Sequence, residues 1–208
     1  VGFKASAYTT GAPTVTLAFD GGGGWGIGRI TAFNSATSVD IEVLSRFYDT
    51  TATDEWREGA WSDVQGWPSA VALHDGRLWW GGEDRIWGSE SDDYTAFNLD
   101  TEGDAGSIQR AIATGGTVDF VSWMLPLQRL VFGTDGCEAT ARASTFDEPL
   151  TPTNIGIKDA SNLGVAAVSP AQMDGRGIFV QRSGVQVYEI LYSIERQDYV
   201  SSELTGLN

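Results

Sequence analysis

Apolar and polar residues alternate along much of the chain with the period of two that is typical of half-buried β-strands. Near the N-terminus such runs cover residues 13–19, 26–34 and 37–45, and Asn34-Ser35-Ala36 form a plausible hairpin turn between the last two. These runs predict a small antiparallel sheet within an N-terminal β segment, residues 1–50.

The remainder of the chain, residues 51–208, contains a pattern of short strands that occurs three times. Each copy has an apolar run, a tight turn, a strand that begins with arginine and a second strand-like run. The arginine-led strands begin Arg77-Leu78-Trp79-Trp80, Arg129-Leu130-Val131-Phe132 and Arg176-Gly177-Ile178-Phe179, and their arginines lie 52 and then 47 residues apart. Repeats of roughly 40 to 50 residues made of short strands are typical of β-propeller blades. We therefore predict an all-β fold in which antiparallel four-stranded blades follow the N-terminal segment.

The repeat also predicts where its elements begin and end. The apolar runs that precede the arginine strands cover residues 70–73, 118–124 and 165–168, and the following runs cover 85–89, 138–143 and 185–190. Residues 91–97 could form one short helical turn, 98–106 form an acidic loop, and 145–162 form a long connection. Alternation along a blade strand predicts one buried face and a second face towards the neighbouring blade. The first face is expected to hold Leu78, Trp80, Leu130, Phe132, Ile178 and Val180, and the second to hold Trp79 and Val131.

The number of repeats indicates whether the chain contains a whole propeller. A closed propeller needs at least four blades, and three repeats are visible. The chain begins at Val1 rather than at a methionine. We therefore expect it to be a piece of a longer polypeptide.

The net charge of the chain limits which partners it can bind. The chain carries 13 basic and 28 acidic residues, a net charge of −15, so its surface repels nucleic acids and anionic membranes. No apolar run reaches the length of a membrane-spanning helix, so no membrane anchor is expected. The single cysteine, Cys137, excludes an internal disulfide, and we expect it to be a small buried residue.

Candidate catalytic and metal-binding patterns are weak. The glycine run at residues 21–24 lacks the Gly-Lys-Ser/Thr ending of a phosphate loop and indicates a flexible turn. The only histidine, His74, stands at a strand end without a serine-protease-type motif around it. Oxygen ligands alternate along residues 98–104, but the EF-hand pattern is not met. We therefore expect no catalytic residue, cofactor or metal site. A concentration of tryptophans at residues 56–87 leaves carbohydrate stacking open beside core packing.

A family resemblance is carried by an ordered set of phrases in residues 55–208. These are Gly66-Trp67-Pro68-Ser69-Ala70-Val71-Ala72-Leu73-His74-Asp75-Gly76-Arg77-Leu78-Trp79-Trp80-Gly81-Gly82, Ile86-Trp87-Gly88-Ser89, Asp93-Tyr94-Thr95-Ala96-Phe97-Asn98, Leu130-Val131-Phe132-Gly133-Thr134, Glu138, Pro149-Leu150-Thr151-Pro152-Thr153-Asn154, Gly164, Val187-Tyr188-Glu189, Tyr192 and Asp198-Tyr199. In this order they resemble the tail nozzle (tail tubular) proteins of short-tailed bacteriophages.

The resemblance implies a structural virion protein that contains a β-propeller and acts in DNA ejection without catalysis. It also implies a homo-oligomeric ring, a hexamer in the family, that contacts tail adaptor and fibre proteins and lets DNA pass without specific binding. Acidic residues expected at the channel or its rim are Asp92, Asp93, Asp100, Glu102 and Asp104, with Glu83 and Asp84 as further candidates. The alternative function is a secreted β-propeller that binds or cleaves carbohydrate.

Overall fold

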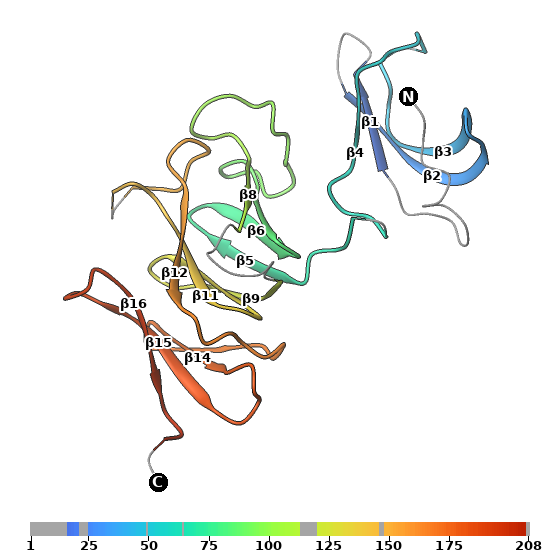
Figure 1. Ribbon diagram of the computed structural model, residues 1–208. Helices are drawn as coiled ribbons and strands as arrows, with labels where there is room; N and C mark the ends of the chain where they lie inside the picture. Colours follow the sequence, from blue (N-terminus) through green and yellow to red (C-terminus); the bar gives the residue numbers. More distant parts are fainter. Residues whose placement is uncertain are drawn as a thin grey trace. The chain divides into compact units, whose positions relative to one another are not determined.

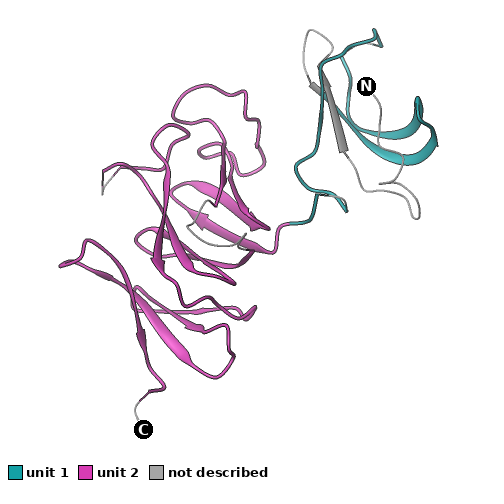
Figure 2. Ribbon diagram, in the orientation of Figure 1, with its two compact units in different colours: residues 1–67 teal, residues 68–208 magenta. Residues whose placement is uncertain are grey.

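The computed structural model describes residues 16–20, 25–48, 50–63, 65–112, 120–145 and 148–206. The chain forms two compact units, Val1–Trp67 and Pro68–Asn208 (Figure 2). Every sheet in the described residues is antiparallel and open, and these residues contain no helix. The all-β fold class and its antiparallel pairing are therefore confirmed.

The first unit holds one four-stranded sheet with the order β3-β2-β1-β4. Its strands are β1 (Thr16–Asp20), β2 (Trp25–Ser35), β3 (Ser38–Ser45) and β4 (Trp56–Glu58). Strands β2 and β3 are the hairpin expected from the alternating pattern, and Ser35 pairs with Ser38 across its turn. The unit extends past residue 50 because β4 pairs with β1 as the fourth strand. Residues 13–15 of the first predicted strand and the glycine run at 21–24 lie outside the described residues.

The second unit holds three four-stranded sheets that follow one another along the chain (Figure 1). In each sheet the strands pair in sequence order, so each is a simple meander. Sheet I comprises β5 (Ala70–His74), β6 (Arg77–Gly82), β7 (Arg85–Gly88) and β8 (Ile108–Ala111). Sheet II comprises β9 (Val121–Pro126), β10 (Leu130–Thr134), β11 (Glu138–Arg142) and β12 (Gly156–Ser161). Sheet III comprises β13 (Ala171–Met173), β14 (Arg176–Val180), β15 (Val187–Ser193) and β16 (Asp198–Glu203).

The arginine phrases occupy equivalent places in these sheets. Arg77 and Arg176 begin the second strands of sheets I and III, and Arg129 directly precedes the second strand of sheet II. The turns before Arg77 and Arg176 are Asp-Gly pairs with positive φ at both residues, 49° and 67° in the first turn and 48° and 75° in the second. This is the backbone of a two-residue type I′ hairpin, which glycine adopts without steric cost.

Sheet II lies between the other two sheets and is covered on both faces. One apolar core joins it to sheet I and includes Trp79, Ile86 and Ile108 of sheet I with Met124, Leu130 and Phe132 of sheet II. A second core joins it to sheet III and includes Trp123, Leu125 and Val131 of sheet II with Phe179, Ile190 and Tyr199 of sheet III. Successive residues of β10 therefore point in opposite directions, each into a different core.

The expected burial of the arginine strands is correct for sheet II and wrong for the other two. Leu130 and Phe132 are fully buried, whereas Leu78, Trp80, Ile178 and Val180 are only half-buried. The reason is that sheets I and III are each covered by sheet II on one face only. In sheet III the residue equivalent to Phe132 is Phe179, so Ile178 and Val180 lie on the opposite face from the one predicted.

Three further expectations about elements are corrected. Residues 165–168 do not form the first strand of sheet III, because Val165 bridges Gln181 and donates its N–H to the Thr134 carbonyl. Residues 145–162 are not a single connection, because β12 pairs with β11 there. Residues 91–97 form turns rather than a helical segment.

Candidate functional site

The acidic loop expected from the sequence joins β7 to β8 and presents its carboxylates to solvent. Loop 89–107 is the name used here for the segment from Ser89 to Ser107. All five predicted channel or rim residues lie in it and are exposed: Asp92, Asp93, Asp100, Glu102 and Asp104. The further candidate Glu83, in the β6–β7 turn, is exposed, and its neighbour Asp84 is half-buried and pairs with Arg85.

Arg77 holds loop 89–107 in its shape. Its side chain is buried, and its guanidinium donates to the carbonyl oxygens of Ser89, Asp104 and Gly106, each at 2.6 Å. These acceptors lie at the two ends of the loop, so one side chain closes it. Burial lowers the pKa of Arg77, while Glu90, Asp75 and Asp92 raise it, and the guanidinium stays charged because its ordinary pKa lies far above neutrality.

Local hydrogen bonds fix the shape of the loop between these ends. Asp93 accepts from the backbone N–H of Thr95 at 3.1 Å and from its hydroxyl at 2.9 Å, and these bonds lower the pKa of Asp93. Glu90 accepts from the Thr101 hydroxyl at 2.7 Å. Asp93 and Glu90 are therefore turn-forming residues, whereas the carboxylates of Glu102 and Asp104 are exposed near the far end of the loop.

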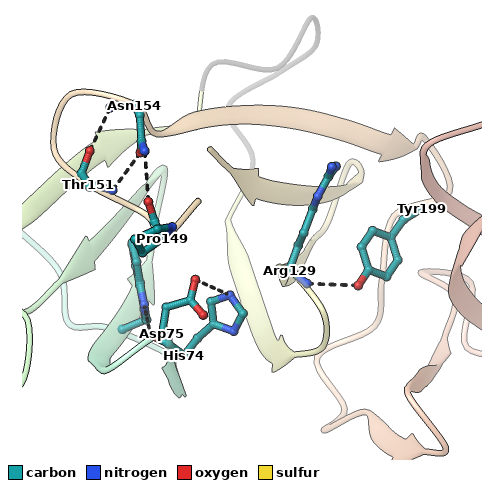
Figure 3. A network of polar contacts seen from close by, with 8 residues as sticks. His74, Asp75, Arg129, Pro149, Thr151, Asn154 and Tyr199 are labelled. Atoms are coloured by element: carbon teal, nitrogen blue, oxygen red, sulfur yellow. Dashed lines mark hydrogen bonds and ion pairs between the residues drawn. The ribbon is translucent and has the colours of Figure 1, made fainter. Parts of the chain in front are cut away.

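The three repeated arginines share a position but differ in environment. Arg77 is buried as a clamp on backbone carbonyls. The guanidinium of Arg129 lies over the Tyr192 ring, 5.4 Å from its centroid, and its backbone N–H donates to the Tyr199 hydroxyl at 3.2 Å (Figure 3). Arg176 is exposed and pairs with Glu189 at 3.1 Å. The repeated arginine therefore stands at the start of the second strand of each sheet, but its side chain makes different contacts in each.

A cleft of about 980 Å³ opens where sheets II and III meet at their turn ends. Its lining includes the polar residues Gln128, Arg129, Arg142, Ser144, Thr145, Tyr192 and Gln197 together with Ala143 and Ile194. The loop that forms one wall is fixed by Asn154, which accepts from the Thr151 N–H at 2.8 Å and donates to the Pro149 carbonyl at 3.0 Å (Figure 3). Two arginines at one cleft favour an anionic or hydroxyl-rich ligand.

A smaller hollow of about 270 Å³ shares Arg129 and Arg142 with this cleft and reaches the sheet I turn. His74 lies on its wall, and its Nε2 is 3.4 Å from the Asp75 carboxylate. Figure 3 marks this contact between the two side chains. Burial lowers the pKa of His74, and the charge of Asp75 opposes that shift. Lowering from 6.5 leaves the imidazole mainly neutral at pH 7.

Glu138 is a buried carboxylic acid that the sequence analysis named only as part of the family resemblance, without a role. It lies on the sheet II face that meets sheet III and is fully buried. Among the described residues no group completes hydrogen-bond geometry with either carboxylate oxygen, although the backbone N–H groups of Leu163, Gly164 and Glu138 itself lie near enough to lower its pKa. Burial outweighs them and raises the pKa of Glu138 from 4.5 to about 7.

Asp92, Asp93, Asp100, Glu102 and Asp104 lie together on loop 89–107, and Glu83 and Asp84 lie in the separate β6–β7 turn. The three repeated arginines each have different surroundings. The sequence analysis assigned no role to Glu138, Arg142 or Tyr192, because the surroundings of these residues come from sheet packing. The strand-like context of Glu138 gave no sign that both faces of sheet II are covered.

Within the ranges that the structure describes, no group of three or more His, Cys, Asp or Glu side chains could hold a metal ion. Among these residues, no helix has the length and apolar character needed to cross a membrane.

The comparisons with known proteins identify no family for this chain. A scan against protein-family models finds no match, and a search of curated proteins finds none. Function is therefore inferred from the fold and from the residues described above.

Proposed function

We propose that the chain is a structural subunit of a bacteriophage tail nozzle and forms part of the conduit for DNA ejection. In this proposal sheets I, II and III are consecutive blades of a β-propeller. The protein acts by shape and assembly in the virion and carries out no chemistry. Its partners are further copies in a ring, a hexamer in the family it resembles, together with tail adaptor and fibre proteins.

The observation that carries the proposal is the fixed and exposed acidic loop. A loop that only solubilises a protein needs no defined conformation. Loop 89–107 instead has both ends closed by Arg77 through three short hydrogen bonds, and Asp100, Glu102 and Asp104 face solvent. Like charge on a shaped rim repels the DNA phosphates, so the polymer slides past without adhering.

The test is a charge reversal in the loop. The variant D100K/E102K/D104K keeps the backbone carbonyl of Asp104 that Arg77 uses, so its free energy of unfolding is expected to change by less than ~1 kcal/mol. Wild-type protein is expected to show no measurable binding of duplex DNA at low salt, where repulsion is least screened. The variant is expected to bind duplex DNA in a salt-dependent manner, and particles assembled with it are expected to release DNA more slowly.

Two results would contradict the proposal. If the wild-type chain binds duplex DNA at low salt, its acidic surface does not repel DNA and the proposed mechanism is wrong. Particles that carry the variant and release DNA at the wild-type rate would show that the loop does not face the DNA path. The matched control is D54K/E55K/E195K, because it makes the same change in net charge at exposed positions outside the loop.

The alternative, a carbohydrate-binding protein, is favoured by the cleft at the junction of sheets II and III. Arg129, Arg142 and the amides of Gln128 and Gln197 could bind hydroxyl or carboxylate groups of a sugar. None of the described lining residues of this cleft carries a carboxylate, so the paired acids of a glycosidase are not provided by them. Binding of oligosaccharides that R129A/R142A abolishes would support this alternative.

A further inference from the structure

Buried polar atoms of Glu138 and Trp123 lie on the sheet II face that meets sheet III. They are the two carboxylate oxygens of Glu138 and the indole Nε1 of Trp123, and none of the three has a hydrogen-bond partner within the described residues. Glu138 is fully buried, and Trp123 is 4% exposed. Buried polar groups are nearly always paired, so this cluster requires a physical explanation.

The register of sheet II places the two side chains next to each other. Gly133 of β10 pairs with Trp123 of β9 on one side and with Glu138 of β11 on the other. The indole ring lies over the glycine, because a Cβ atom at position 133 would come within 2.4 Å of Trp123 Cε2 and 2.9 Å of its Nε1. The indole N–H and the carboxyl group therefore occupy the same part of the apolar junction between sheets II and III.

Glu138 also adjoins the segment that joins sheet II to sheet III. The backbone N–H of Gly164 in this segment acts on its carboxyl group. The Gly164 carbonyl accepts from the Arg182 N–H at 3.0 Å, just after β14, and the next residue, Val165, donates its N–H to the Thr134 carbonyl of sheet II at 2.8 Å. The segment is bonded to both sheets, so a change at Glu138 acts where sheet III is joined to sheet II.

The junction of sheets II and III is the weaker of the two junctions in this unit. Among the described residues, the core shared with sheet I contains fifteen buried apolar residues, and the core shared with sheet III contains eight. The cleft of about 980 Å³ also opens at the turn end of the second junction. Local opening begins where apolar contacts are fewest, so sheet III is expected to separate before sheet I does.

Charged and titratable side chains lie on the elements around Glu138, but burial and backbone N–H groups set its pKa. The described side chains of this kind are Arg129, Asp135, Arg142, Lys158, Arg182, Tyr188, Tyr192, Asp198, Tyr199 and Glu203. Lys158 pairs with Asp198, and the Arg182 guanidinium donates to the Asp135 carbonyl at 3.2 Å. Ionisation of Glu138 therefore places a negative charge in an apolar junction, which is costly.

We propose that Glu138 is a proton switch that controls how firmly sheet III is held against sheet II. The protonated acid allows the two sheets to pack. When the proton leaves to solvent, the buried carboxylate favours a state in which sheet III has separated, because opening returns the charge to water. Sheets I and II stay together in that state. This inference goes beyond the proposed conduit and does not depend on DNA, so the charge-reversal assay of loop 89–107 tests the conduit separately.

The direction of the pH dependence follows from the pKa of Glu138. Burial raises this pKa from 4.5 to about 7, and separation of the sheets returns it to its ordinary value. The protonated acid therefore stabilises the packed state in full below about pH 4.5, and this contribution is lost as the pH rises towards 7.

Amide hydrogen exchange of the full chain, followed by mass spectrometry at pH 4.5 and pH 8, tests the switch. Wild type and Glu138→Gln are compared at the same pH, which cancels the pH dependence of exchange itself. The two proteins are expected to exchange alike at pH 4.5. At pH 8 the wild type is expected to exchange on the order of 100-fold faster in β13–β16, as about 2.5 pKa units imply, and at the rate of the variant in β5–β8.

Trp123 reports the ionisation independently. Its indole N–H resonance, identified as the one absent from the Trp123→Phe variant, is expected to shift with a midpoint at about pH 7 in the wild type and to stay constant in Glu138→Gln. The controls are Glu148→Gln, which removes an exposed acid of sheet II, and His74→Gln; both are expected to keep the shift. If Glu138→Gln does not fold, Glu138→Leu replaces it, because leucine cannot ionise either.

Three results would overturn the inference. Equal acceleration of exchange in all three sheets at pH 8 would mean that Glu138 lowers the stability of the whole unit without releasing sheet III. A Trp123 resonance that does not shift, or that shifts in Glu138→Gln as well, would mean that the carboxyl group does not ionise beside it. Loss of the shift in His74→Gln would assign the titration to the histidine.

Discussion

Glu138 provides a quantitative test of the packing between sheets II and III. Its carboxyl group is fully buried, and burial raises its pKa from 4.5 to about 7. A raised carboxyl pKa means that the folded state retains the proton to higher pH than the unfolded state does. The stability contributed by the neutral acid is present in full below about pH 4.5 and is lost as the pH rises towards 7.

The size of this effect follows from the pKa values. A difference of about 2.5 pKa units corresponds to about 3 kcal/mol. Glu138→Gln keeps the shape of the neutral acid and cannot ionise. We therefore expect the variant to match the wild type near pH 4.5 and to exceed its free energy of unfolding by up to about 3 kcal/mol at pH 8.

Urea denaturation of both proteins between pH 4.5 and 8 measures this difference. Subtracting the two curves removes the contribution of other titrating groups, such as Asp198. Burial raises the pKa of Asp198, but hydrogen bonds from Lys158 and from the Tyr199 N–H lower it by more. The pKa of Asp198 is therefore below its ordinary value. A wild-type to variant difference that stays constant across this pH range would refute the buried environment of Glu138.

Two further predictions concern side chains of β6. Arg77→Met removes the donors to Ser89, Asp104 and Gly106. We expect the free energy of unfolding to fall by about 2–4 kcal/mol and amide hydrogen exchange to become faster in loop 89–107 only. Unchanged exchange in this loop would contradict the role of Arg77 in holding it. Trp79→Ala is expected to destabilise by about 3–5 kcal/mol because it empties the core between sheets I and II, and Trp80→Ala is expected to cost clearly less in thermal or urea unfolding. Equal losses for the two tryptophan variants would contradict the assigned faces.

The sequence was informative where local chemistry decides the structure. The Asp75-Gly76 and Asp174-Gly175 pairs adopt the positive φ that a two-residue hairpin requires, so turns and the strands after them could be located. The alternation of apolar residues also predicted the antiparallel all-β fold.

The sequence was less informative where distant segments decide the structure. Strand β12 was missed because its residues Gly156–Ser161 are largely polar and become a strand by pairing with β11. The clamp of Arg77 joins carbonyls as far as 29 positions along the chain, which no local pattern reveals. The face of Ile178 was misassigned because one glycine, Gly177, stands where an apolar residue was expected.

The proposal that the chain is a conduit subunit is tested most directly by cryo-electron microscopy of tail particles that contain it. The account predicts a ring of copies in which sheets I to III form successive blades and loop 89–107 lines the lumen or its rim, with Glu102 and Asp104 facing the DNA path. A ring with this loop on its outer surface, or particles in which the chain forms no ring, would contradict the account.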